Sequence, residues 1–273
     1  MSELAERIRA SVTGAQLFPL SPCASGFQET RGGCLDGVCN ICGEFVEFVD
    51  FRLDDQRESG FCPRCGSFCR QRQIMKVFRA LTGQSEDAPL NLPSSFAIYN
   101  TESSRAVHDL LSQHPRYVCS EYFGPDIPSG PYRGAVRQED LQRLSLPADS
   151  FDVVLSSDVF EHIPNPYVAH REIWRVLKAG GHHIFTVPFH TGEALDDVRA
   201  VESNGEVSYL KEKIFHGDPV RPENGVLVWT IPGLQMLVKL AEIGFKPSIY
   251  QLHDRDHGII GAWSLVFVAQ KLI

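Results

Sequence analysis

The segment at residues 141–188 constrains the fold most strongly, because it places an amphipathic stretch between two apolar runs. The first run, FDVVL at 151–155, is rich in β-branched residues, as expected for a strand buried on both faces. Apolar residues then recur at helical spacing over 167–177, and a Gly-Gly pair just beyond them provides a helix stop. The second run, HHIFTVP at 182–188, predicts another strand. Strand, helix and strand in this order predict a parallel sheet with a right-handed crossover.

This segment also carries a family resemblance. The sequence LPADSFDVVLSSDVFEHIPNP, followed by REIWRVLKAGGHHIFTVP, resembles the central motifs of class I S-adenosylmethionine (SAM)-dependent methyltransferases. The resemblance covers residues 95–273 and implies an α/β, Rossmann-like sheet that is mostly parallel with an antiparallel last strand. It also implies SAM as cofactor. A doubly wound α/β protein of unrelated activity with a Gly-Gly turn is the alternative interpretation.

Length and charge narrow the class of protein. The 273 residues allow one large domain, or a medium domain with a smaller one. A net charge of −8 argues against a broad nucleic-acid surface, although a local basic groove remains compatible with it.

No apolar run approaches the roughly 20 residues needed to cross a bilayer. Residues 1–12 are charged, lack the apolar core of a secretory signal and predict a short amphipathic helix. We therefore expect a cytoplasmic protein without a membrane partner, and the sequence predicts no oligomeric state.

Cysteine spacing predicts a metal site near the N-terminus. Cys39 and Cys42 form one Cys-x-x-Cys pair, Cys62 and Cys65 form a second, and each pair is followed by glycine. Two cysteines at this spacing can reach one ion from a tight turn, and the glycine permits the positive φ that the turn needs. Two such pairs complete a closed tetrahedral site for structural Zn²⁺. Between them, EFVEFVDFRL alternates apolar and polar residues, as a strand of a zinc ribbon does.

The zinc-ribbon region is expected to form a unit of its own. We predict an N-terminal helix and zinc ribbon over residues 1–92 and a methyltransferase domain over 93–273, with a lid insertion at about 191–229. Cys34 and Cys69 are the substitutes if one ligand is misassigned. After the second pair comes an amphipathic helix whose basic residues predict a solvated face, or alternatively a cradle for an anionic substrate or RNA: Arg70, Arg72, Lys76 and Arg79.

The methionine end of the implied SAM pocket departs from the family pattern. The first core strand should lead into a glycine-rich turn. In this chain the turn runs from Asn100 through Thr101 and Ser103 to Ser104, with the sequence NTESS, and contains no glycine. Thr101 or Ser103 is expected to bind the methionine carboxylate at the following helix N-terminus, where anions are favoured. The resemblance implies that the backbone carbonyl of Ser156 accepts a hydrogen bond from the methionine ammonium. It also places Asp158 at the edge of the same pocket. The departure leaves two outcomes, an atypical SAM pocket or one that has lost SAM.

The adenosine end matches the family better. The resemblance implies that Glu121, at the end of the second strand, binds both ribose hydroxyls. Tyr122 beside it would contact the adenine. Asp140 matches the acid that accepts from the adenine amino group, with the backbone N–H of Leu141 as donor. The alternatives are an exposed strand-end acid for Glu121 and a helix cap for Asp140.

Three histidines are candidates for the base that removes a proton from the acceptor: His162, His190 and His216. His162 follows the fourth strand, although the same position often has a structural role in the family. The predicted function is SAM-dependent methylation of oxygen, nitrogen or carbon in a small molecule, sugar or natural product. The alternatives are an RNA base methyltransferase that uses the zinc ribbon as a clamp, and a non-catalytic binding module that has lost SAM.

Overall fold

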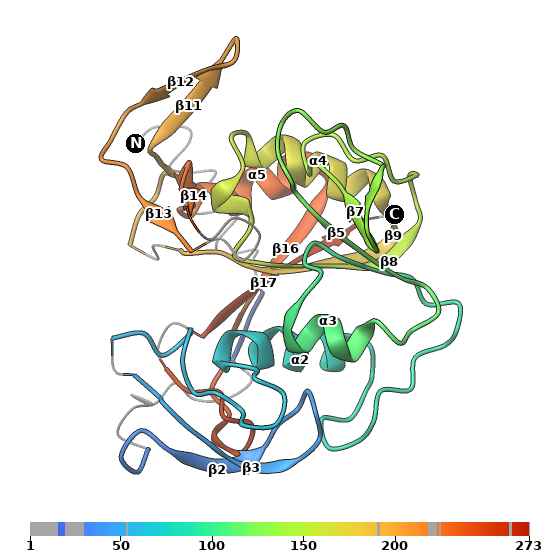
Figure 1. The fold of residues 1–273 in the computed structure, drawn as a ribbon, viewed down its shortest axis with the longest axis vertical. Helices are drawn as coiled ribbons and strands as arrows, with labels where there is room; N and C mark the ends of the chain where they lie inside the picture. The colour runs from blue at the N-terminus through green and yellow to red at the C-terminus, as the bar shows by residue number, and fades with distance from the viewer. Residues whose placement is uncertain are drawn as a thin grey trace.

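Figure 1 shows the fold of the chain as a computed structural model. The expected helix within residues 1–12 and the candidate base His190 lie outside the described residues. The structure describes residues 16–19, 30–52, 54–189, 192–217, 223, 225–261 and 264–272.

A central sheet contains the predicted strand–helix–strand unit. Its order is β1-β16-β17-β9-β8-β4-β5-β7-β6. Strands β7, β5, β4, β8 and β9 are parallel neighbours, whereas β17 runs antiparallel between β9 and β16. The expected Rossmann-like α/β fold, mostly parallel with an antiparallel last strand, is therefore confirmed. The strands are β1 (Gln16–Pro19), β4 (Ile98–Asn100), β5 (Tyr117–Glu121), β6 (Tyr132–Arg133), β7 (Val136–Gln138), β8 (Phe151–Ser157), β9 (Leu177–Thr186), β16 (Phe245–Gln251) and β17 (Leu265–Lys271).

Helices cover both faces of this sheet (Figure 1). Helices α4 and α5 pack together on one face, and α2 and α3 lie on the other. Among the described residues, no helix combines the length and apolar character that crossing a membrane requires. The helices are α2 (Cys69–Leu81), α3 (Arg105–Leu111), α4 (Pro166–Val176) and α5 (Gln235–Ile243), with short 3₁₀ turns η2 (Phe160–His162) and η3 (Arg255–His257).

The connection from α4 to β9 differs from the prediction. Helix α4 starts at Pro166, a residue suited to the first helical position because its missing N–H has no intrahelical partner to lose. The helix ends at Val176 and β9 follows at once, so the expected Gly-Gly helix stop is wrong. Both glycines lie inside β9. Gly180 has φ 80°, and the pairing of β8 with β9 shifts register nearby, which indicates a β-bulge.

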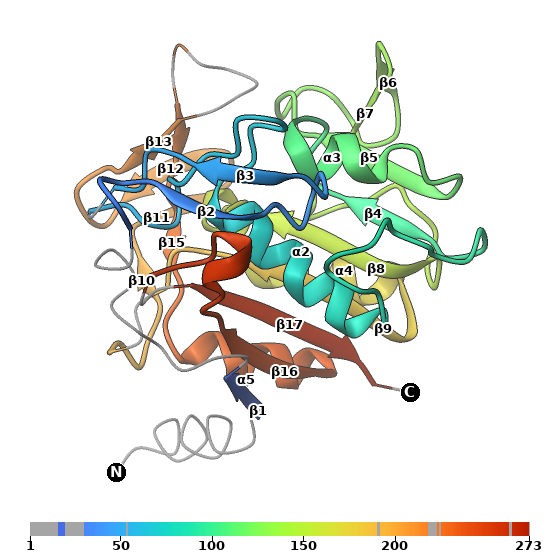
Figure 2. The same cartoon turned by 90° about the horizontal axis from the view of Figure 1, so that it is seen from below.

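Helix α2 joins the cysteine-rich region to the sheet. The hairpin of β2 (Leu35–Val38) and β3 (Phe45–Phe48) lies on the side of α2 that faces away from the central sheet. This side is nearest the viewer in Figure 2. Met75 and Phe78 of α2 belong to one buried cluster with Phe48 of β3 and Val153 of β8. The cysteine-rich region and the sheet therefore share a hydrophobic core.

The basic residues of α2 are buried, which corrects the expected solvated face. Arg72 has no exposed surface. Its guanidinium donates to the backbone carbonyls of Gly60 and Ser67, beside the second cysteine pair, and of His257 and Gly258, between β16 and β17. Such contacts require both segments to be folded, so periodicity within the helix alone could not reveal them.

The neighbouring cations on α2 also form hydrogen bonds or ion pairs within the protein. Arg79 donates to the backbone carbonyl of Asn40, and Lys76 forms ion pairs with Glu86 and Asp254. These side chains are therefore unavailable as an RNA cradle.

The segment expected to form a lid contains short paired strands. Residues 191–229 carry the hairpin β11–β12, which projects from the rest of the molecule in Figure 1. The other two pairs are β13–β14 and β10–β15, of which β15 begins just after residue 229. The strands are β10 (Asp197–Val198), β11 (Ala200–Ser203), β12 (Glu206–Tyr209), β13 (Phe215–His216), β14 (Val226–Leu227) and β15 (Thr230–Ile231).

Candidate functional site

A cavity of about 1300 Å³ opens at the carboxyl ends of β4, β5 and β8. In open α/β sheets, ligands bind at this edge because the strand-end loops diverge there. The strand-end loops form one wall. Arg57, from the cysteine-rich region, and Arg70, near the start of α2, line a second side. Phe215, Leu227 and Trp229, from the predicted lid, form a third. Three separate parts of the chain thus line the cavity.

Glu121 and Thr101, two of the residues expected to bind SAM, line this cavity. One carboxylate oxygen of Glu121, Oε1, accepts hydrogen bonds of 2.9 Å from both the backbone N–H and the hydroxyl of Ser103. These two bonds attach the glycine-free turn to the end of β5. The buried Oγ1 of Thr101 has no hydrogen-bond partner among the described residues, which makes it a candidate ligand contact.

The residues predicted for the adenine also come together at the cavity. Tyr122, Asp140 and Leu141 all line it. The Asp140 carboxylate accepts a 2.9 Å hydrogen bond from the backbone N–H of Gln142, and the Asp140 N–H donates to Ser129 Oγ at 2.9 Å. These contacts orient the residue before any ligand binds.

Asn100, Ser103 and Ser156 are not among the side chains that line the cavity. Asn100 Nδ2 donates to the Tyr117 hydroxyl at 3.0 Å. Ser156 Oγ lies 2.8 Å from His183 Nε2 inside the sheet. Their side chains therefore support the strand ends that carry the cavity residues.

Asp158 lies at the rim, where it pairs with two arginines. Arg57 Nη2 is 2.8 Å and Arg70 Nε 3.4 Å from its carboxylate oxygens. Burial disfavours the charged carboxylate, but the two guanidinium groups outweigh this and hold the pKa of Asp158 well below its usual range. Asp158 also has φ 51°, a strained conformation for a residue with a side chain. Arg57 was not predicted, because nothing local links it to a residue 101 positions away.

Glu102 is a second cavity residue to which the sequence assigned no role. It stands in the glycine-free turn and lines the cavity. Burial raises its pKa to about 7, and nearby Arg70 and Arg105 only partly oppose this. Arg105, which begins α3, has φ 73°. The left-handed backbone conformation that glycine usually adopts is therefore present at the end of this turn, but a residue with a long side chain, Arg105, adopts it.

Two of the three candidate histidines meet at the cavity. His162, in η2, and His216, in β13, both line it, and His216 Nδ1 lies 3.2 Å from His162 Nε2. Between them is the carboxylate of Glu161, whose Oε1 is 3.5 Å from His162 Nε2 and 3.7 Å from His216 Nδ1. Glu161 was not singled out from the sequence, because an acid beside a histidine is not distinctive without the approach of β13.

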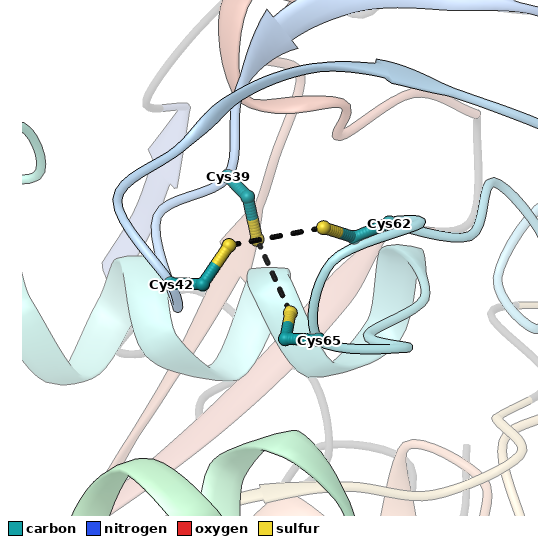
Figure 3. A group of neighbouring side chains, drawn as sticks. All are labelled: Cys39, Cys42, Cys62 and Cys65. Carbon is teal, nitrogen blue, oxygen red and sulfur yellow. Dashed lines mark hydrogen bonds between the residues drawn. The ribbon is translucent and has the colours of Figure 1, made fainter.

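The four predicted zinc ligands converge, as Figure 3 shows. Their sulfur atoms all lie within 4.8 Å of one another. Cys39 is 3.7 Å from Cys65 and Cys42 is 3.8 Å from Cys62, sulfur to sulfur. A tetrahedral ion with Zn–S bonds of about 2.3 Å holds its sulfurs about 3.8 Å apart, so the spacing fits zinc. The backbone folds each pair into a similar turn, with Gly43 N–H donating to Cys39 O and Gly66 N–H to Cys62 O.

The two substitute cysteines lie elsewhere. Cys69 is fully buried at the start of α2, where its sulfur lies 3.5 Å from the Ile260 carbonyl. Cys34 is half-buried, and neither belongs to the four-sulfur group.

Comparison with known protein families identifies part of this fold. Residues 111–185 match a family model described as a methyltransferase domain. The match runs from the end of α3 through β5, β8 and α4 to β9, so it includes the strands that carry Glu121 and Asp158. It supports a SAM-dependent methyltransferase, the enzyme class expected from the sequence. No curated protein matches the chain.

Several solved structures resemble the chain at a distance. A SAM-dependent methyltransferase from Mesorhizobium loti is 17% identical, with 73% of this chain and 98% of that chain covered and a TM-score of 0.43. The 1,6-didemethyltoxoflavin-N1-methyltransferase of Burkholderia thailandensis is 15% identical, with 75% and 79% covered and a TM-score of 0.42. A Haloferax volcanii complex of the Trm112 activator with a putative methyltransferase gives 11% identity, 75% and 90% coverage and a TM-score of 0.43. These similarities assign no substrate to this chain.

Proposed function

We propose that the chain transfers a methyl group from SAM to an oxygen, nitrogen or carbon atom of a small molecule, with sugars and natural products included. The observation that carries this proposal is the cavity at the carboxyl ends of the parallel strands. Its volume of about 1300 Å³ exceeds the roughly 300–1000 Å³ of an ordinary ligand pocket, which leaves room for a cofactor beside an acceptor.

The residues at one end of the cavity suit SAM. Glu121 would bind the ribose hydroxyls, and Asp140 with the Leu141 N–H would bind the adenine edge. The unpartnered Thr101 hydroxyl and the Glu102 carboxylate offer polar groups for the cationic methionine end. SAM supplies an activated methyl group on a sulfonium centre. The protein itself would align the acceptor with that methyl group and remove the acceptor's proton.

The other end of the cavity suits the acceptor. His162 and His216 face it, and Phe215, Leu227 and Trp229 provide apolar cover from the segment 191–229. Histidine can take a proton near neutral pH, so we propose this end as the place where an acceptor loses its proton. His190 remains a candidate on sequence grounds alone.

The RNA alternative receives less support. The cations of α2 that would have bound phosphates are buried: Arg72, Lys76 and Arg79. Arg70 faces the cavity, but it is paired with Glu58 and Asp158. We therefore favour a small-molecule acceptor in a cytoplasmic protein.

The first test is calorimetric titration of the purified chain with SAM and with S-adenosylhomocysteine. Micromolar binding is expected. If folded protein binds neither compound, the non-catalytic alternative replaces this proposal, because the glycine-free turn would then have closed the cofactor site.

A charge-removing variant tests the cofactor end. Glu121→Gln keeps an acceptor for Ser103 but removes the carboxylate charge, so the Kd for S-adenosylhomocysteine should rise about 5- to 150-fold, equivalent to roughly 1–3 kcal/mol. Glu206→Ala, on the exposed strand β12, is the control and should bind as the wild type does. Equal affinity in both variants would assign the ribose to another acid.

We further propose that Cys39, Cys42, Cys62 and Cys65 hold one structural Zn²⁺. Four thiolates leave no open position for a substrate, so the ion would stabilise the two turns and take no part in the reaction. Metal analysis of the full chain should find zinc, and replacement of any one of the four cysteines should remove it. Zinc that survives replacement of Cys39 or Cys62 would overturn the ligand set.

A further inference from the structure

The group formed by Glu161, His162 and His216 has features that the proposed methyl transfer does not require. Glu161 and His162 stand in η2 directly after β8, whereas His216 comes from β13, more than 50 residues later. One carboxylate oxygen and two ring nitrogens of this group lie within 4.8 Å of one another. Ligand atoms on a tetrahedral zinc are about 3.3 Å apart, and the distances here are 3.2, 3.5 and 3.7 Å.

The hydrogen bonding of His162 prepares one ring nitrogen to bind a cation. Its Nδ1 lies 2.9 Å from the backbone carbonyl of Leu227. A carbonyl can only accept, so Nδ1 carries the proton and Nε2 presents its lone pair to Glu161 and His216. Metal-binding histidines are commonly oriented in this way, by donating the other N–H to a backbone carbonyl.

The environment of Glu161 points to a missing cation. Its side chain is fully buried, and among the described residues neither carboxylate oxygen has a hydrogen-bond partner. The arginines in the cavity do not neutralise it, since Arg57 and Arg70 bind Asp158 instead. A buried carboxylate without such contacts is costly, and a bound metal ion would supply the missing positive charge.

A similar cluster elsewhere already contains a cation of the protein. Glu86, Asp254 and His257 also lie within ligand distance of one another. There the ammonium of Lys76 is paired with both carboxylates, so the cation is already supplied by the protein. No lysine or arginine among the described residues pairs with Glu161, which separates the two clusters chemically.

We propose that Glu161, His162 and His216 bind one divalent first-row transition metal, such as Zn²⁺, at the acceptor end of the cavity. Two imidazoles and a carboxylate suit this class of ion and leave at least one coordination position open. His162 and His216 line the cavity, so the open position faces it. Binding of the ion does not depend on the proposed function.

The use of the ion does rest on the proposed function. A divalent metal lowers the pKa of an oxygen that binds it and orients that oxygen. The acceptor best served by this site therefore carries a hydroxyl, phenol or carboxylate oxygen at or beside the methylated atom. The histidines then act as metal ligands, and the acceptor's proton leaves to solvent.

Cobalt titration of the full chain tests the site. Protein already carrying zinc at the four cysteines should bind one further Co²⁺, with visible d–d absorption and without the thiolate-to-cobalt charge-transfer band that exchange into the cysteine cluster would produce. His216→Ala and Glu161→Gln should each raise the Kd for Co²⁺ at least about tenfold. His114→Ala removes a histidine that does not line the cavity and is the matched control.

Thermal unfolding separates loss of a ligand from loss of the fold. Glu161→Gln replaces a buried carboxylate that accepts no hydrogen bond from the described residues by a neutral group of nearly the same shape, so the variant should unfold no earlier than metal-free wild type. Co²⁺ should raise the Tm of wild type and of His114→Ala, but not of Glu161→Gln.

Two results would overturn the proposal: no second ion on the wild type at millimolar Co²⁺, or a second ion held equally well by both ligand variants. Either would leave a proton-bridged histidine pair beside Glu161. Calorimetry with S-adenosylhomocysteine on the same samples separates this failure from failure of the proposed function, because cofactor binding without a second metal ion would contradict only the metal site.

Discussion

The four-cysteine cluster and the cavity differ in how the chain assembles them. Each half of the cluster is a single turn, with Cys39 and Cys42 in one and Cys62 and Cys65 in the other. The cavity instead draws on strand ends, on the cysteine-rich region and on the lid segment. A site made of local turns leaves a spacing that can be read along the chain, whereas a site made of distant segments leaves only scattered polar residues.

Helix α2 connects these two regions. One of its side chains, Arg70, reaches the cavity and another, Arg72, binds the backbone beside the second cysteine pair. The cysteine-rich region is therefore expected to support the cavity wall as well as its own fold. Three predictions test how strongly the two regions depend on each other.

Loss of a zinc ligand should have the largest effect. Cys39→Ser should remove the ion and cost several kcal/mol of unfolding free energy, because binding of a structural zinc contributes directly to folding. Metal analysis and thermal unfolding of the full chain measure both effects. Cys34→Ser, outside the four-sulfur group, should keep its zinc. If Cys39→Ser lost zinc but kept full stability and cofactor affinity, the cavity would be independent of the cluster.

Removal of the Arg72 side chain should have the next largest effect. Arg72→Met preserves much of the apolar stem but leaves buried carbonyls on two segments without a donor, at a cost of about 3–5 kcal/mol. Urea denaturation measures this cost. Arg64→Ala, at an exposed position between Cys62 and Cys65, should change stability by less than about 0.5 kcal/mol. Similar values for the two variants would mean that Arg72 does not hold the regions together.

The smallest expected effect concerns Glu102 and depends on pH. Its folded-state pKa, about 7, is higher than in an unfolded chain, so the folded protein binds the proton more tightly. The wild type should therefore lose stability relative to Glu102→Gln as pH rises from about 4.5 to 8, by roughly 1–3 kcal/mol. The charged groups around Glu102 are Arg70, Arg105, Glu121 and Asp158.

The measurement for Glu102 is urea denaturation of both proteins across this pH range. The difference between them should be smallest below about pH 4.5, where Glu102 is protonated in both the folded and the unfolded state. A constant difference across the range would show that Glu102 is not desolvated in the folded protein.

The sequence alone determined the features that depend on local periodicity and spacing. The apolar runs of β8 and β9 with α4 between them predicted the parallel sheet, and the doubled cysteine spacing predicted a four-sulfur group. Glu121 and Asp140 were picked out by the family resemblance, and both line the cavity. In each case, the residues that matter are close enough in the chain for backbone geometry to bring them together.

Features that require two distant segments became visible only in the folded chain. The pairing of Asp158 with Arg57 and Arg70, the burial of Arg72, and the approach of His216 to Glu161 all join segments separated by scores of residues. Hydrophobic burial sets which segments meet, and it depends on the whole core. A charged residue on an amphipathic helix therefore looks solvated in the sequence until another segment folds over it.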